Sequence, residues 1–202
     1  MCYHVSMHLF IFDMGNVFLS DIAVLDGMSR ILSIPESDLQ SDYSALEHAL
    51  MEGSMKAGDY YRHLEDKFGV TITEDIYADC FNPGVNAGLI DLVDEFRRQG
   101  IRCVVGSNTS DPHWKKIHRM EEKPLEHFDA LYASHLMGIA KPDPAFWAYI
   151  LREEKAEPQD TLFIDDLEEN CLGAGSLGIT TFRFSGENAV ERLRTFAEGF
   201  VR

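Results

Sequence analysis

The stretch that most constrains the fold is an unbroken apolar run, Leu9 to Phe12, which ends at a single carboxylate, Asp13. Short runs of β-branched and aromatic residues are typical of a strand buried on both faces inside a parallel sheet. Asp13 then stands at the carboxyl end of that strand, where open α/β sheets bind their ligands. Gly15 and Asn16 tolerate the backbone angles of a tight loop, whose N–H groups can turn toward an anion. Taken alone, Asp13 has an ordinary alternative, a cap of the turn after the strand.

The charge of the chain narrows the class of partner. The 202 residues are enough for one substantial domain, or for a core domain with a small insert. With 18 Lys and Arg against 34 Asp and Glu, the formal net charge is −16. We therefore expect no nucleic-acid partner and no anionic membrane partner. A small anionic substrate would need a local positive group or a bound cation, because the global field repels it.

The cysteines and the N-terminus indicate a cytoplasmic protein. Cys2, Cys80, Cys103 and Cys171 form no C-x-x-C pair, which predicts free thiols in a reducing compartment, with Cys103 and Cys171 as small buried hydrophobes. The first residues lack a basic region of the kind that opens a signal peptide. No apolar stretch approaches the roughly 18 residues that span a membrane. Met7 is an alternative start, which would leave residues 1–6 dispensable.

Residues 21–84 are predicted to form a small helical cap domain. Helical apolar spacing covers residues 21–32, 36–53 and 58–68, and Thr73 is expected to cap a fourth short helix that ends near Cys80. No strand pattern interrupts these helices. The core domain is then predicted to comprise residues 1–20 and 85–202. Met51, Met55, Tyr60 and Tyr61 are expected to be core residues or pocket wall of the cap.

From residue 86 onward the pattern alternates between helix and strand. Strands are expected at 101–105, 130–133, 161–165 and 180–184, and helices at 88–99, 111–119, 144–154, 166–177 and 188–200. Such alternation implies right-handed βαβ crossovers and a parallel sheet covered by helices on both faces. The predicted fold class is α/β, a Rossmann-like three-layer core with an inserted helical cap.

Polar side chains follow several of these strands. Asp13 follows the first strand, Ser107, Asn108 and Thr109 follow the second, and Asp165 and Asp166 end another. A loop with Lys141 precedes the helix that starts at Pro144, for which Asp143 is the expected cap. The carboxyl ends of parallel strands share one edge, so these groups can converge. Such a set can supply a nucleophilic carboxylate, oxygen ligands for a hard cation, and donors for phosphate oxygens.

The sequence resembles the haloacid dehalogenase (HAD) superfamily in four ordered motifs: FDMGNV, VVGSNTS, GIAKPDPAFW and FIDDLEEN. The resemblance implies a hydrolase with a helical C1 cap, in which Asp13 is the nucleophile and forms an aspartyl-phosphate. It further implies a Mg²⁺ cofactor ligated by Asp13, the carbonyl of Gly15 and Asp165, with support from Asp166. The implied phosphate-binding residues are Ser107, Asn108 and Lys141, while Asn170 is expected to orient the loop.

One position departs from the common pattern of the family's phosphatases. In the pattern that this chain resembles, a second aspartate stands two residues after the nucleophile and acts as general acid and base. In this chain that residue is Gly15. A positioned general acid contributes about 10²–10⁴ in rate. Its loss favours a leaving oxygen that needs little protonation, as in an anomeric sugar phosphate. The D-x-G-N version of the motif is similar to that of sugar-phosphate members of the glucose-1-phosphate phosphatase type.

The expected function is therefore a Mg²⁺-dependent phosphatase of a small phosphorylated metabolite. Two alternatives stay open: a catalytically weak or inactive regulatory protein that binds its ligand without turnover, and a haloacid dehalogenase. The acidic pair Asp165 and Asp166 implies a cation, which a dehalogenase does not need. Gly173, Gly175 and Gly178 match G-x-G-x-x-G but stand inside a helix, so close helix packing accounts for them better than a dinucleotide. The sequence leaves monomer and homodimer both open.

Overall fold

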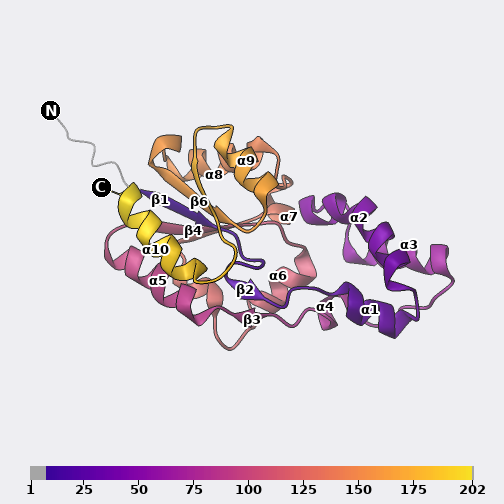
Figure 1. Cartoon of the computed structure of the whole chain (residues 1–202). Helices are drawn as coiled ribbons and strands as arrows, with labels where there is room; N and C mark the ends of the chain where they lie inside the picture. Colours follow the sequence, from indigo (N-terminus) through magenta and orange to yellow (C-terminus); the bar gives the residue numbers. More distant parts are fainter. Residues whose placement is uncertain (1–7, 202) are drawn as a thin grey trace.

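A five-stranded parallel sheet forms the centre of the computed structural model, which describes residues 8–201 (Figure 1). β1 occupies the middle and pairs in parallel with β4 on one side and β6 on the other. Its four side chains are all buried. The strands, in the order that they take across the sheet, are β5 (Ala130–Ala133), β4 (Arg102–Ser107), β1 (Leu9–Phe12), β6 (Thr161–Asp165) and β7 (Thr180–Arg183). The predicted strand at 9–12, buried on both faces, is confirmed.

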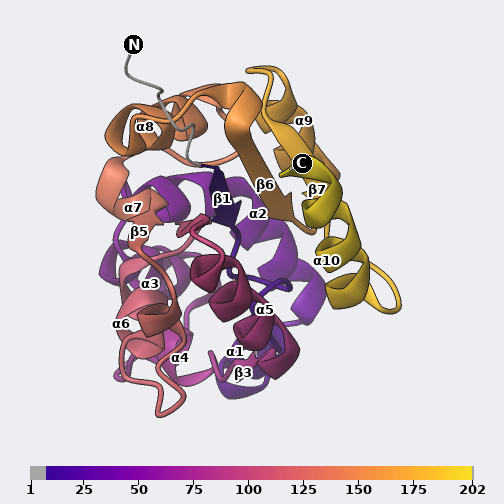
Figure 2. The same ribbon diagram turned by 90° about the vertical axis from the view of Figure 1, so that its left-hand side faces the viewer.

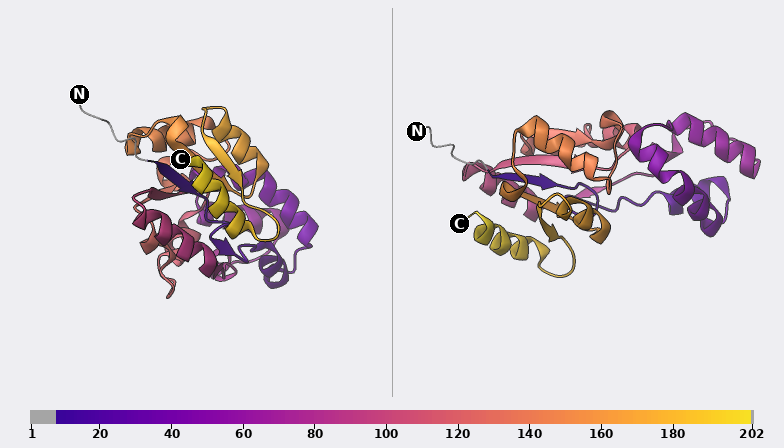
Figure 3. Two further views of the ribbon diagram at one scale, coloured as in Figure 1. Left: turned by 60° about the vertical axis from the view of Figure 1, so that its left-hand side comes forward. Right: turned by 90° about the horizontal axis from the view of Figure 1, so that it is seen from above.

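Helices cover both faces of this sheet (Figure 3). Phe10 and Phe12 belong to one apolar cluster, shared with α5 (Ala87–Arg98) and α10 (Ala189–Phe200). Leu9 and Ile11 point to the opposite face, into a second cluster with α8 (Pro144–Glu154) and α9 (Glu168–Gly175). Successive side chains of a strand alternate between the faces, so a continuous apolar run is what two covered faces require. The predicted three-layer α/β core is confirmed.

The chain order of the strands places a crevice beside β1. From β1 the chain builds β4 and then β5 on one side, and afterwards returns to build β6 and β7 on the other. The strand order therefore reverses next to β1. At such a switch point the loops after adjacent strands diverge, which opens a crevice at their carboxyl ends.

Four helices lie beyond the carboxyl ends of the strands (Figures 1 and 2). They are α1 (Leu25–Leu32), α2 (Glu36–Glu52), α3 (Ala57–Phe68) and α4 (Ile76–Asp79), and we call them the cap helices. Two short antiparallel strands, β2 (Leu19–Ser20) and β3 (Gly84–Val85), pair where the chain enters and leaves this region. The predicted domain limits after residues 20 and 84 fall at this ribbon, and the division into two domains remains a prediction.

The cap helices approach the core closely at α7 (Ser134–Met137), the short helix after β5. The Ser134 hydroxyl donates a hydrogen bond to the carbonyl of Met51, in α2. At Gly53, just after α2, φ is +79° and a Cβ would lie 2.7 Å from the carbonyl oxygen of His135. A left-handed backbone and a backbone neighbour at that distance leave room only for glycine.

Several element limits differ from the sequence prediction. α1 begins at Leu25 and not at residue 21, since Asp21 has a φ of 55°, outside the helical region. The fourth cap helix is capped by Asp75, whose side chain accepts from the N–H of Ala78, and not by Thr73. β2, β3 and α7 were not predicted, nor were the two 3₁₀ turns η1 (Pro124–His127) and η2 (Pro158–Asp160). α6 spans Asp111–Ile117, two residues shorter than expected.

Cys80, Cys103 and Cys171 are free thiols, as predicted. Cys103 is fully buried, but Cys171 is only partly buried. Cys2 and the alternative start at Met7 lie outside the described residues. Within residues 8–201, the helices are all too short or too polar to cross a bilayer.

Candidate active site

The register of the sheet brings three predicted site residues to one edge. Phe12 pairs with Val105 of β4 and with Ile164 of β6. The N–H of Asp13 donates to the carbonyl of Ile164 over 2.9 Å, so Asp13 leaves β1 directly beside Asp165. Ser107 ends β4 on the other side of β1 and is buried. The parallel pairing of β1 and β6 therefore places Asp13 beside Asp165, although the two are 152 residues apart in the sequence.

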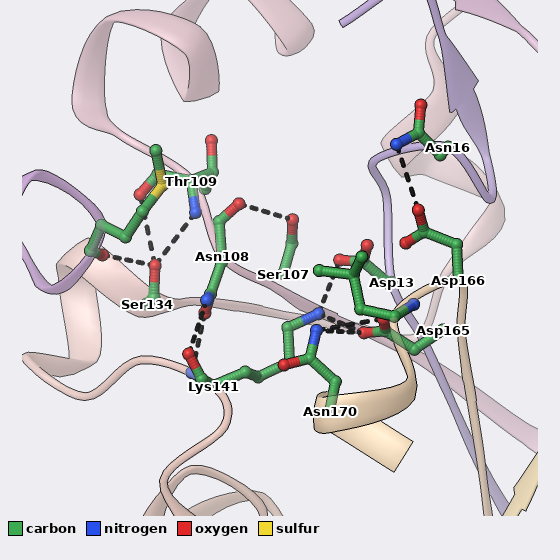
Figure 4. A network of polar contacts seen from close by, with 12 residues as sticks. Asp13, Asn16, Ser107, Asn108, Thr109, Ser134, Lys141, Asp165, Asp166 and Asn170 are labelled. Atoms are coloured by element: carbon green, nitrogen blue, oxygen red, sulfur yellow. Dashed lines mark hydrogen bonds and ion pairs between the residues drawn. The ribbon is translucent and has the colours of Figure 1, made fainter. Parts of the chain in front are cut away.

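Lys141 lies between the two buried carboxylates (Figure 4). Its Nζ is 2.8 Å from Oδ1 of Asp13 and 2.7 Å from Oδ2 of Asp165. The residue is only 3% exposed. Burial by itself would lower the pKa of Lys141, but the two carboxylates outweigh it and hold that pKa above its ordinary value. The ammonium stays charged and is fixed at the carboxylate of Asp13.

The Asn108 amide holds the backbone of Lys141. Its Nδ2 donates to the carbonyl of Lys141 over 2.9 Å, and its Oδ1 accepts from the N–H of Lys141 over 2.9 Å. Both polar atoms of the side chain are thus engaged with the backbone of one residue, Lys141. In this conformation Asn108 positions the loop that carries Lys141, while its predicted phosphate contact remains a prediction.

Asp165 is held by donors on its own loop and helix. Nδ2 of Asn170 lies 3.0 Å from both carboxylate oxygens, and the N–H of Leu167 donates to Oδ1 over 2.9 Å. Asp165 is fully buried and Asn170 is 3% exposed. Asn170, expected to orient the loop, therefore fixes the orientation of the Asp165 carboxylate (Figure 4).

Asp166 points toward the loop after β1. The Nδ2 of Asn16 donates to Oδ2 of Asp166 over 3.1 Å. Burial raises the pKa of Asp166, as does the neighbouring Asp165, whereas the Asn16 bond lowers it. The sequence predicts that Asn16 tolerates the tight loop after β1, and its φ of 52° confirms a left-handed backbone there, which asparagine adopts more readily than most residues. The bond from its side chain to Asp166 was not predicted.

The carboxylates of Asp13, Asp165 and Asp166 suit a divalent cation. One oxygen from each lies within 4.8 Å of the others. Burial raises the pKa of Asp13 to about 7, Lys141 lowers it and Asp165 raises it again. One ammonium cannot neutralise three carboxylates, and a buried charge that is not compensated is costly. Hard oxygen ligands of this kind are those that Mg²⁺ prefers. Gly15 lies on the same loop, and its carbonyl remains a predicted ligand.

One further residue, Ser134, braces the loop after β4. The hydroxyl of Ser134 accepts from the N–H of Thr109 over 3.0 Å and lies 3.2 Å from the carbonyl of Thr109. Through its contact with Met51, the same hydroxyl joins this loop to α2. Ser107 Oγ itself lies 3.4 Å from the carbonyl of Asn108. Ser134 could not be predicted from the sequence, because its partners lie 25 and 83 residues away.

The tyrosines of the cap helices are mostly core residues. Tyr60 is fully buried, and the hydroxyl groups of Tyr43 and Tyr77 lie 2.9 Å apart. Tyr61 instead lines a cavity of about 500 Å³ between the cap helices and α6. Its hydroxyl donates a hydrogen bond to the Asp75 carboxylate. The expectation of core or pocket wall holds for Tyr60 and Tyr61. Met51 and Met55, for which it was also made, pack against the main apolar cluster.

The three glycines of the G-x-G-x-x-G pattern lie in α9 and in the turn that follows it. A Cβ on Gly173 would lie 2.5 Å from the carbonyl oxygen of Pro142, so α9 packs closely on the loop after Lys141. Gly178 has a φ of +84°, and Gly175 faces open space. Close packing accounts for Gly173, a left-handed turn accounts for Gly178, and neither accounts for Gly175. The helix position rejects a dinucleotide site, as predicted.

The fold and this site define a Rossmann-like α/β protein with a buried carboxylate and lysine centre at the switch point of its sheet. Comparison with known families agrees. The sequence model of the haloacid dehalogenase-like hydrolases matches residues 7–178, and the chain therefore belongs to that family of hydrolases.

Among curated proteins, the chain is similar to the sesquiterpene phosphatase astK of Aspergillus oryzae, with 25% identity over 84% of this chain and 85% of that protein. It is also similar to the D-ribitol-5-phosphate phosphatase of Bacteroides thetaiotaomicron, with 26% identity over 86% of this chain and 89% of that protein. Among solved structures, a HAD-family enzyme of Bacteroides thetaiotaomicron in complex with magnesium and inorganic phosphate superposes with a TM-score of 0.75. It is 22% identical, and the match covers 91% of this chain and 96% of that one.

Proposed function

We propose that the protein is a Mg²⁺-dependent phosphomonoesterase that acts through an aspartyl-phosphate on a small phosphorylated metabolite, with a sugar phosphate as the preferred substrate class. The observation that carries this proposal is the contact of Lys141 with Asp13 and Asp165 at the switch point of the sheet. A carboxylate placed beside a fixed ammonium and two further carboxylates fits nucleophilic attack on phosphorus.

In the first step an oxygen of Asp13 attacks the phosphorus, and the bond between phosphorus and the ester oxygen breaks. Lys141 neutralises charge on the phosphoryl group, and Ser107 donates to one of its oxygens. In the second step water attacks the phosphorus, and the electron pair of the Asp13–phosphorus bond returns to Asp13. The sum is ester and water to alcohol and phosphate. When bound at Asp13, Asp165 and Asp166, Mg²⁺ supplies positive charge and a fixed position for the phosphoryl oxygens.

The relatives support this reaction class. Two curated proteins that match over more than four fifths of the chain are named phosphatases, one of a polyol phosphate and one of sesquiterpenes. The structural neighbour binds magnesium and inorganic phosphate. Gly15, in the place of the usual general acid, supports a substrate whose leaving oxygen departs easily, such as an anomeric sugar phosphate.

The test is phosphate release from a panel of sugar phosphates, polyol phosphates, nucleotides, flavin mononucleotide and farnesyl phosphate, measured with Mg²⁺ and with EDTA. We expect turnover that EDTA abolishes and that is highest on an anomeric phosphate. Asp13→Asn, which keeps the size of the side chain but removes the nucleophilic oxygen pair, should lose at least 10³-fold in kcat, since the nucleophile is not replaced.

Two results would point elsewhere. A folded protein that binds Mg²⁺ but releases no phosphate from any ester would favour the regulatory alternative. Release of halide from a haloacid, indifferent to EDTA, would favour the dehalogenase. Full Mg²⁺-dependent activity in Asp13→Asn would show that the nucleophile lies elsewhere.

A further inference from the structure

The space beside the Asp13 carboxylate is bounded by an apolar side chain. A Cβ built on Gly15 would lie 3.8 Å from Oδ2 of Asp13 and 2.8 Å from Cδ1 of Ile22. The φ of Gly15 is outside the left-handed region, so its backbone would accept any L residue. A side chain at position 15 would therefore need the flexible Cδ1 end of Ile22 to shift, whereas the backbone there would need no change.

The path of the chain fixes Ile22 at this place. The N–H of Leu19 donates to the carbonyl of Met14 over 2.7 Å, which folds the loop after β1 back on itself. Leu19 and Ser20 then pair with β3, and Asp21 turns the chain with a φ of 55°. Ile22 follows and packs, partly buried, against the main apolar cluster. The position that faces Gly15 is thus set by a paired ribbon.

No second proton donor takes over this position in the part of the chain that the structure describes. The side chain that donates to Asp13 is Lys141, which is shared with Asp165. Asp166, the other nearby acid, is directed to Asn16. A leaving oxygen on the Gly15 side of Asp13 meets the methyl end of Ile22.

We infer that Ile22, with Gly15, is a specificity-determining element that restricts the enzyme to phosphate esters whose leaving oxygen departs as a stable anion, and disfavours ordinary alkyl phosphates. This inference rests on the proposed phosphatase function. Asp13 forms its bond to phosphorus while the ester oxygen takes the electron pair of the breaking bond and leaves unprotonated. That oxygen then takes a proton from solvent water, and the hydroxide so formed is neutralised by the proton released when water cleaves the aspartyl-phosphate.

The experiment compares esters that differ in leaving-group acidity and little in size: a series of substituted phenyl phosphates, and benzyl phosphate as the alkyl case. For the natural protein, log(kcat/KM) should rise steeply with the acidity of the leaving group. Ile22→Ala opens the space without adding an acid, so its dependence should stay steep. Gly15→Asp with Ile22→Ala adds a proton donor, and should raise turnover of benzyl phosphate at least 10-fold, toward the 10²–10⁴ that a positioned acid supplies.

The double variant Gly15→Asn with Ile22→Ala is the matched control, because asparagine has the shape of aspartate but cannot act as a general acid. Its log(kcat/KM) should still rise steeply with the acidity of the leaving group. Equal leaving-group profiles for the Asp and Asn double variants would overturn the inference that the lack of an acid in the space between Gly15 and Ile22 sets the leaving-group preference. A shallow profile in the natural protein, which needs no variant to measure, would overturn the inference and leave the phosphatase intact. No release from even the most acidic phenol ester would instead overturn the proposed function.

Discussion

At the scale of single residues, the candidate site depends on one buried cation. Lys141 is in contact with two carboxylates, and all three groups are nearly inaccessible to solvent. When one member of a buried charge cluster is removed, its partners remain desolvated without compensation, which costs several kcal/mol. The positions of Asp13, Lys141 and Asp165 are therefore energetically coupled, and substitutions among them should not be additive.

Asn108 offers a way to disturb Lys141 without removing a charge. Asn108→Ala deletes both hydrogen bonds to the backbone of Lys141, and we expect it to lower kcat and to cost about 1–3 kcal/mol of folding free energy. The measurements are steady-state kinetics on the best ester and urea unfolding. Asn82→Ala, which removes an exposed amide bonded to the carbonyl of Asp79, is the matched control and should leave kcat unchanged. An Asn108→Ala protein of unaltered stability would show that these two bonds do not hold the loop.

The sequence was sufficient to bring Asp13, Ser107, Lys141, Asp165 and Asp166 together, because four of them end or follow parallel strands whose carboxyl ends must meet. It did not predict that Asn108 bonds the backbone of Lys141 or that Asn16 bonds Asp166. Those contacts depend on how loops turn and which rotamer a side chain takes. Neither leaves a periodic trace in the sequence.

At the scale of secondary structure, α9 shows how one sequence pattern conceals three physical situations. Gly173, Gly175 and Gly178 are equivalent in the G-x-G-x-x-G pattern. In the fold, a Cβ built on Gly173 would clash with the Pro142 carbonyl and the Trp147 ring, whereas one built on Gly175 would have no neighbour within 4 Å. Gly178 lies in the turn after the helix and has a positive φ. Long helices were predicted because their apolar period repeats, whereas the two-residue strands β2 and β3 have too few residues to show one.

This difference within α9 predicts opposite effects for two alanine substitutions. Gly173→Ala places a Cβ against backbone that cannot move freely, so we expect a loss of about 1–3 kcal/mol in unfolding free energy. It should also lower kcat, because the obstructing carbonyl belongs to the residue after Lys141. Gly175→Ala should be neutral or add up to about 1 kcal/mol, as is usual for glycine to alanine in a helix. Urea unfolding measures the unfolding free energy of both variants. Equal values would contradict the close approach of Gly173 to the Pro142 carbonyl.

At the scale of the whole molecule, the cap helices and the core share a buried aromatic contact. The imidazole of His113, in α6, lies between the rings of Tyr77 and Phe81, with ring centroids 4.1 Å away on each side. Its Nε2 is 3.0 Å from the carbonyl of Tyr77, a residue of α4. The sequence could not predict this stack, because its partners are 36 and 32 residues away along the chain.

The stack predicts a pH dependence of stability. Burial lowers the pKa of His113 from 6.5 to about 4, while the Tyr77 carbonyl and Asp75 raise it and Lys116 lowers it further. Below pH 6.5 His113 therefore binds a proton in the unfolded chain, whereas in the folded chain it stays neutral until the pH approaches 4. The stability from neutral His113 is present above pH 6.5 and is lost as the pH falls toward 4, by about 2 kcal/mol between pH 8 and pH 5.

His113→Phe keeps an aromatic ring between Tyr77 and Phe81 but has no proton to take up. The variant should be less stable than the natural protein at pH 8, where it lacks the bond to the Tyr77 carbonyl. Since every other titrating group is common to both proteins, the gap between their unfolding free energies should narrow by about 2 kcal/mol by pH 5. Urea unfolding at pH 8, 6.5 and 5 measures that gap. Parallel pH curves would mean that His113 accepts its proton in the folded state, and that the contact between cap helices and core opens well below the free energy of global unfolding.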